Sequence, residues 1–206
     1  MSGVMVTRTL TQAELRSAGI GAFFRPRDIE RLGLSFRDLE CMVAAGQVEK
    51  IGKGLYRLVA AATTEFETIA MVSSAVPSGI VCLLSALRLH DIGTQAPHEV
   101  WIAIDRKARK PSRLPGRARV IRFSGAMLSY GVTTRPISGV PVRVTSPART
   151  VVDCFRYRNK VGLDVAIEAL SDAVRSRKAT ISEISRAAEA CRARTVIRPY
   201  LEAVTA

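Results

Sequence analysis

The sequence predicts a mixed α+β fold in which an N-terminal winged helix-turn-helix domain, residues 1–60, precedes a larger helix–sheet–helix domain, residues 61–206. Three short helix signals and a hairpin signal follow one another in the first sixty residues. Apolar, β-rich segments then fill the middle of the chain, and helical periodicity returns in its last third. With 206 residues, 48% of them hydrophobic, the chain has enough apolar side chains for a buried core.

The N-terminal helices are predicted from their capping signals. A capping box, Thr11-Gln-Ala-Glu14, opens the first helix, a proline suited to a first helical position opens the second, and a serine opens the third. A short apolar piece, residues 22–24, lies between the first two. The predicted helices run from Thr11 to Gly19, from Pro26 to Gly33 and from Ser35 to Gly46.

Residues 47–59 predict two short strands around the turn Ile51-Gly-Lys-Gly54. Three helices followed by a hairpin is the winged-helix plan. In that plan the third helix enters the major groove of DNA and the hairpin lies on the neighbouring backbone.

The larger domain begins after an Ala-rich junction at residues 60–62. Its first helix is predicted from a second capping box, Thr64-Glu-Phe-Glu67, to about Ala75, and the next from Ile80 to His90. Four strands are expected next, at residues 99–104, 118–123, 132–137 and 140–144. The last third predicts helices from Ser146 to about Asn159, across the stripe from Leu163 to Val174, and from Thr180 to Cys191, with Pro199 limiting any further helix.

The net charge of +13 is the first indication of function, because a cationic surface attracts a phosphate backbone. Solubility alone is the alternative explanation. The excess is uneven, however, since residues 105–122 by themselves carry a net charge of +7. This pattern favours a charged face that binds nucleic acid.

The candidate DNA contacts lie on the third helix and the hairpin. Ser35, Phe36 and Arg37 occupy the first turn of the third helix, where recognition helices meet base edges, and Arg37 suits a guanine edge. A solvated Arg37 is the alternative. Basic side chains suited to phosphates follow on the second helix and the hairpin: Arg25, Arg27, Lys50, Lys53 and Arg57.

The loop of residues 106–117 is a possible secondary DNA contact, and a merely solvated loop is its alternative. Its candidate residues are Arg106, Lys107, Arg109, Lys110 and Arg113.

No catalytic residues, metal ligands or cofactor site are predicted. The chain lacks a phosphate-binding Gly-x-x-x-x-Gly-Lys loop, a nucleophile elbow and the acidic patterns of nucleases and nucleotidyltransferases. His90, at a helix end, is expected to cap or pack, and the four separated cysteines are expected to be reduced and mostly buried. Without a signal peptide or an apolar span, we expect a cytoplasmic protein that does not contact membranes.

Several blocks of the sequence resemble a known family. They are Arg27–Glu30, Gly33–Glu40, Ala45–Leu58, Pro77–His90, Thr94–Ile104 and, most distinctively, Thr145–Asp164. Together they cover nearly the whole chain. On these blocks the sequence resembles the AbiEi-like antitoxins of type IV, abortive-infection E toxin–antitoxin systems.

The resemblance implies a transcriptional autoregulator that acts in phage defence. It would repress its own operon by binding repeated promoter sites in double-stranded DNA, and it would counter a nucleotidyltransferase-like toxin, often without binding that toxin directly. The alternatives are a stand-alone transcriptional regulator whose second domain senses a ligand or partner, and an enzyme that modifies the toxin or a nucleic acid. No set of residues supports the enzyme.

Overall fold

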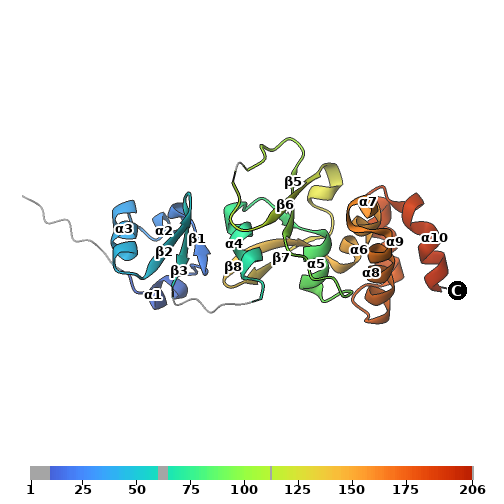
Figure 1. Ribbon diagram of the computed structural model, residues 1–206, viewed down its shortest axis with the longest axis horizontal. Helices are drawn as coiled ribbons and strands as arrows, with labels where there is room; N and C mark the ends of the chain where they lie inside the picture. The colour runs from blue at the N-terminus through green and yellow to red at the C-terminus, as the bar shows by residue number, and fades with distance from the viewer. Residues whose placement is uncertain (1–9, 60–64, 112, 206) are drawn as a thin grey trace, which may run out of the picture.

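A computed structural model describes residues 10–59, 65–111 and 113–205 of the chain. Figure 1 shows three parts in a row: an N-terminal domain of small helices and strands, a central sheet with two helices, and a bundle of C-terminal helices. The fold is therefore of the mixed α+β class that the sequence predicts. No helix within the described ranges combines the length and the apolar character needed to span a membrane.

The N-terminal domain has the winged-helix order of elements. These are α1 (Gln12–Ser17), β1 (Phe23–Phe24), α2 (Pro26–Glu30), α3 (Phe36–Ala44), β2 (Val48–Gly52) and β3 (Leu55–Leu58). The three strands form an antiparallel sheet in the order β1-β3-β2, so that the predicted hairpin is confirmed. The strand β1, which pairs with β3, accounts for the apolar piece at residues 22–24.

The core of this domain comes from its own elements. Leu15 of α1, Ile29 of α2, and Leu39 and Met42 of α3 are fully buried against Leu58 of β3. Leu39 and Met42 are three residues apart and so lie on one face of α3, which is its buried face.

The central part contains a five-stranded mixed sheet in the order β6-β5-β4-β8-β7. Pairing is parallel between β5 and β6 and between β4 and β8, and antiparallel between β4 and β5 and between β7 and β8. Its elements are α4 (Glu67–Ala75), β4 (Ile80–Val81), α5 (Leu83–His90), β5 (Val100–Asp105), β6 (Ala118–Phe123), the 3-10 helix η1 (Gly125–Leu128), β7 (Val132–Ile137) and β8 (Val140–Thr145).

Two predictions for this part need correction. The helix predicted from Ile80 to His90 is a strand followed by a helix, because Ile80 and Val81 pair with β5, and Val81 also pairs with β8. The helix predicted from Thr64 begins at Glu67, with Phe66 as its N-cap, and the Glu67 carboxylate lies 3.0 Å from the guanidinium of Arg57. Thr64, the other member of the predicted capping box, lies outside the described residues.

The C-terminal helices are α6 (Pro147–Arg156), α7 (Arg158–Val161), α8 (Leu163–Arg175), α9 (Ile181–Ala190) and α10 (Arg194–Thr205). Ser146 and Thr180 cap α6 and α9 as predicted. Pro199 does not end the helix near the C-terminus: α10 continues through it. Pro199 has no N–H to donate to the preceding turn, and the helix tolerates this one missing bond.

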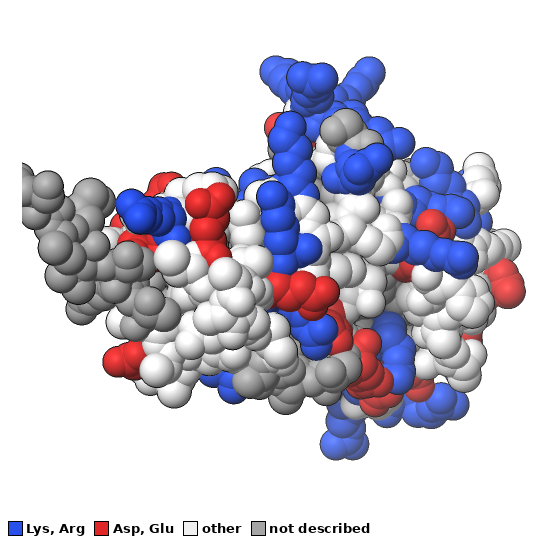
Figure 2. Space-filling view, turned by 60° about the vertical axis from the view of Figure 1, so that its left-hand side comes forward, with Lys and Arg blue, Asp and Glu red and all other residues white. Residues whose placement is uncertain are grey.

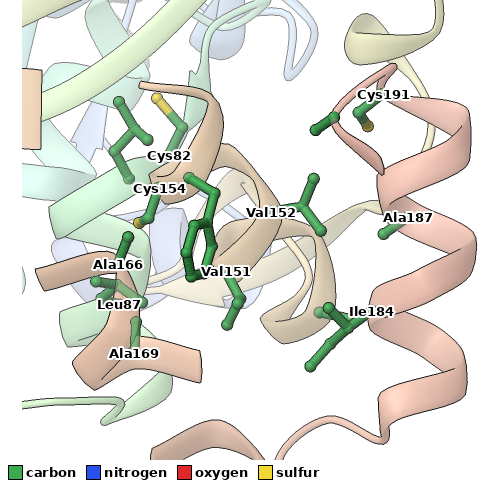
Figure 3. Close-up of a cluster of buried hydrophobic side chains, with 14 of the residues drawn as sticks. Cys82, Leu87, Val151, Val152, Cys154, Ala166, Ala169, Ile184, Ala187 and Cys191 are labelled. Atoms are coloured by element: carbon green, nitrogen blue, oxygen red, sulfur yellow. The ribbon is translucent and has the colours of Figure 1, made fainter. Parts of the chain in front are cut away.

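Helix α6 is the centre of the C-terminal packing. Figure 3 shows Val151, Val152 and Cys154 of α6 between the helices that flank it, with Ala166 and Ala169 of α8 on one side and Ile184 of α9 on the other. Small residues on α8 and α9 allow close approach of the helices to α6. Cys82, Cys154 and Cys191 are buried and Cys41 is half-buried, and all four are free thiols.

The N-terminal domain is fixed directly to the central sheet. The amide of Ala22 donates to the carbonyl of Ser138, in the turn between β7 and β8, at 2.8 Å. A side chain on Gly21 would lie 2.7 Å from the backbone of Gly139, so the two backbones touch where neither residue has a Cβ. The hydroxyl of Ser74 on α4 also donates to the carbonyl of Phe23 at 3.2 Å.

Candidate nucleic-acid interface

The start of α3 is fixed by a reciprocal capping box. The Ser35 hydroxyl accepts from the amide of Asp38 at 3.2 Å, and the Asp38 carboxylate accepts from the amide and the hydroxyl of Ser35 at 2.8 and 2.7 Å. Asp38 is buried beneath the turn. Ser35 therefore holds the first turn of α3 in shape, and its hydroxyl is committed to this cap.

Phe36 and Arg37 follow the cap on the outer face of α3. Phe36 is 49% exposed, so its ring is open to a partner in solution. The side chain of Arg37 is also exposed, whereas Leu39 and Met42 point into the core. The structure thus brings together an apolar ring and a guanidinium at the end of α3 that a recognition helix presents to base edges.

The wing presents two lysines to solvent. Lys50 lies on β2, the edge strand of the small sheet, and Lys53 lies in the turn, where Gly54 has a φ of +63° that favours glycine. Arg27, on α2, is exposed as well, and its nearest acidic atom is the Asp28 carboxylate at 3.9 Å. These three cations have the exposure that phosphate contacts require.

Two of the predicted phosphate contacts have partners within the protein. Arg25 donates to the carbonyl of Ala75 at the end of α4, and Arg57 forms the ion pair with Glu67 at the start of the same helix. Both guanidiniums therefore help to join the two domains, whereas Arg27, Lys50 and Lys53 are exposed. The sequence signal for the ion pair of Arg57 was the acidic Glu67 shortly after the hairpin. A capping box explained the position of Glu67 equally well.

The cationic loop lies beside the wing. Figure 2 shows Lys and Arg side chains gathered over the loop that joins β5 to β6, and Arg106, Lys107, Arg109, Lys110 and Arg113 are all exposed. A cavity of about 670 Å³ separates the loop from the wing. Gly52 and Lys53 line it from the wing, Arg113 lines it from the loop, and no acidic residue contributes to its walls.

The ends of the loop are fixed to the sheet. Arg122 of β6 donates to the carbonyl of Asp105 at 2.9 Å, and the Asp105 carboxylate accepts from the amide of Lys107 at 2.8 Å. The only acidic residue at this end of the loop is therefore engaged with the backbone. The positive field of the neighbouring cations faces solvent with little local compensation.

His90 is a packing group. Its ring Nε2 donates to the carbonyl of Thr145 at 2.6 Å, and burial lowers the pKa of the imidazole below its usual value. In the ranges that the structure describes, no three His, Cys, Asp or Glu side chains are grouped as metal ligands.

Arg149 and Asp153 are the largest departure from an apolar interior. Both are fully buried on α6, with the guanidinium Nε 2.8 Å from the carboxylate and the other nitrogens donating to the carbonyls of Tyr130 and Met127. Burial raises the pKa of Asp153 to about 6, and Arg149 opposes that shift. The pair is enclosed by protein and so belongs to the fold of the larger domain.

The comparisons with known proteins agree with the geometry of the N-terminal domain. Residues 12–59 match the family model described as "Transcriptional regulator, AbiEi antitoxin". Over this segment the chain is similar to AbiEi antitoxin regulators. The resemblance found in the sequence is confirmed by this match, while its blocks beyond residue 59 lie outside the matched range.

One solved structure resembles most of the chain. The RV2827C protein from Mycobacterium tuberculosis aligns with a TM-score of 0.54 over 96% of this chain and 81% of that one, at 13% identity. At this identity the likeness shows a shared fold that extends through the larger domain. No curated protein sequence matches the chain.

Proposed function

We propose that the protein is an AbiEi-type antitoxin that represses its own operon by binding promoter DNA through its winged helix. The observation that carries the proposal is the joint exposure of the first turn of α3, the lysines of the wing and the cationic loop beside it. The match of residues 12–59 to antitoxin regulators supports the same function.

Each exposed group has a role in the proposed complex. The guanidinium of Arg37 pairs with a guanine edge in the major groove, and the ring of Phe36 contacts a thymine methyl. Arg27, Lys50 and Lys53 bind phosphates, which position the helix without reading sequence. The loop cations bind the backbone beyond the wing and so lengthen the contacted DNA.

The larger domain, in this proposal, counters the effect of a nucleotidyltransferase-like toxin in the cytoplasm. The proposed activity has no enzymatic step and no cofactor. A stand-alone regulator would bind DNA equally well but would not restore growth of cells that express the product of a neighbouring nucleotidyltransferase-like gene. Coexpression with that gene therefore separates the two functions.

The first test is binding of the purified protein to its own upstream DNA and to a scrambled fragment of equal length, across a salt series. Tighter binding to the upstream fragment, with a steep loss of affinity as salt rises, is the expected result, because each phosphate contact adds about −0.9 to the log–log slope. Equal, weak binding to both fragments would refute sequence-specific repression.

A further inference from the structure

A second cavity lies where the N-terminal domain meets the central sheet. Its volume is about 450 Å³, within the range of small-molecule sites, which are frequent at domain interfaces. Helix α2 and the segment before β1 line one side. Helix α4 and the turn between β7 and β8 line the other side. An occupant would therefore touch both the helix that precedes the recognition helix and the larger domain.

The walls of this junction cavity are mostly apolar, and one polar group inside has no partner. Phe23, Phe24, Val140 and Pro141 contribute hydrophobic surface. Ser73 of α4 is only 5% exposed, and its hydroxyl makes no hydrogen bond within the described part of the chain. Because buried hydroxyls are nearly always paired, this orphan group indicates a missing hydrogen-bond partner.

The charged side chains at the cavity are two arginines and one aspartate. Arg27 lies on α2 and Arg31 is the C-cap of that helix, four residues further on, and both are exposed. Asp28 also lines the cavity, but one oxygen of its carboxylate accepts from the amide of Arg25 at 2.7 Å. The cavity thus offers two guanidiniums to an anion beside an apolar chamber.

We propose that the junction cavity binds a small organic acid with an aromatic or other apolar body and a single anionic group. The apolar body lies against Phe23, Phe24 and Val140 and offers a polar atom to the Ser73 hydroxyl, while the anion pairs with Arg27 and Arg31. Bound there, the ligand bridges α2 and the larger domain. Its anion also occupies Arg27, which the proposed function assigns to a DNA phosphate, so the site is suited to an effector that competes with DNA for this side chain.

The test uses two fluorescent probes on the full-length protein: 1-anilinonaphthalene-8-sulfonate, and N-phenyl-1-naphthylamine, which has the same rings without the sulfonate. We expect saturable binding of the sulfonate, about tenfold weaker in the double variant Arg27→Gln/Arg31→Gln. Binding of the uncharged probe should change little in that variant. Amide resonances of Gly19, Gly21 and Ser73 should shift on addition of the sulfonate.

The matched control is Lys53→Gln/Arg113→Gln, which removes two cations from the cavity between the wing and the loop. This variant should bind the sulfonate as the wild type does. The proposal is overturned if the control loses the sulfonate while the Arg27 and Arg31 variant keeps it, or if the three amides do not shift. None of these measurements requires DNA, so they are independent of the proposed repression.

Discussion

At the scale of single residues, the buried pair of Arg149 and Asp153 links the chemistry of one carboxyl group to the stability of the larger domain. The guanidinium has carbonyl partners as well as the carboxylate and lies over the ring of Phe123 at 5.2 Å. The carboxylate, by contrast, has one oxygen without a hydrogen bond among the described residues. The effect of burial on the Asp153 carboxyl group therefore outweighs the opposing effect of Arg149, and the pKa of Asp153 is raised.

This raised pKa predicts a pH-dependent stability. The pKa of Asp153 is about 6 in the folded protein, above the usual 3.8, so the folded state retains a proton that the unfolded chain loses between these values. The stability of the wild type relative to Asp153→Asn should thus fall, by roughly 3 kcal/mol, as the pH rises from 4 to 6, and stay level above. Urea unfolding at a series of pH values measures it.

Arg37 gives the residue-scale prediction for DNA. Its side chain is exposed and has no hydrogen bond or ion pair among the described residues, so Arg37→Ala should leave folding intact and weaken operator binding by about 1–3 kcal/mol. Neutralisation of the toxin should persist largely unchanged. Gel-shift titration and a growth-rescue assay measure the two effects, with Arg198→Ala on α10 as the control. Parallel loss of both activities in Arg37→Ala would contradict this division of labour.

At the scale of elements, local signals predicted much of the architecture. Capping boxes at Thr11 and Thr180 and the turn before Gly54 depend on neighbours within a few residues, and their elements form as expected. Strand β4 could not be predicted in this way, because Ile80 and Val81 become a strand only by pairing with residues 102, 103 and 144. The partners of Arg25 and Arg57 could not be predicted either, because they lie on α4 and meet these arginines only when the two domains pack together.

The capping box of α3 is itself testable. Replacement of Ser35 by Ala removes the side-chain acceptor for the amide of Asp38, and should lower the free energy of unfolding by about 1 kcal/mol. Ser35→Thr keeps a hydroxyl and should restore most of this loss. Denaturant unfolding of the three proteins makes the comparison, and equal midpoints would show that the cap contributes nothing.

The loop between β5 and β6 leads to a prediction about phosphate contacts. If Arg109, Lys110 and Arg113 each bind one phosphate, their replacement by Gln should reduce the log–log salt slope by about 2.7 in total. Preference for the upstream fragment should remain, because these cations do not read bases. A matched triple variant at the distant end, Arg175→Gln/Arg194→Gln/Arg198→Gln, should keep the wild-type slope. An unchanged slope in the loop variant would remove the loop from the interface.

At the scale of the whole molecule, α3 and the C-terminal bundle lie at opposite ends of the row of three parts (Figure 1). The contact of Gly21 with Gly139 and the hydrogen bond from Ala22 to Ser138 fix the winged helix to the central sheet. This arrangement separates α3 from the bundle. In the proposed complex, DNA bound at the winged helix leaves the surface of the C-terminal bundle open.

The junction predicts that the two domains unfold together. Gly21→Ala would place a methyl group 2.7 Å from the backbone of Gly139. The two domains must then separate slightly, or the backbone at their contact must become strained. We expect a loss of about 1–3 kcal/mol and a broader thermal transition measured by calorimetry. Gly52→Ala, where an added Cβ meets no atom within 4 Å, is the matched control. A normal transition in Gly21→Ala would show that the junction is compliant.

The same contact sets an order of events during synthesis. Every core residue of the winged helix precedes residue 59, whereas Ser138 and Gly139, which hold it to the central sheet, come about eighty residues later. At roughly 5–20 residues per second, a ribosome needs about 4–16 s to cover that interval. For those seconds a nascent chain has all the core residues of its winged helix and none of the turn that will anchor it.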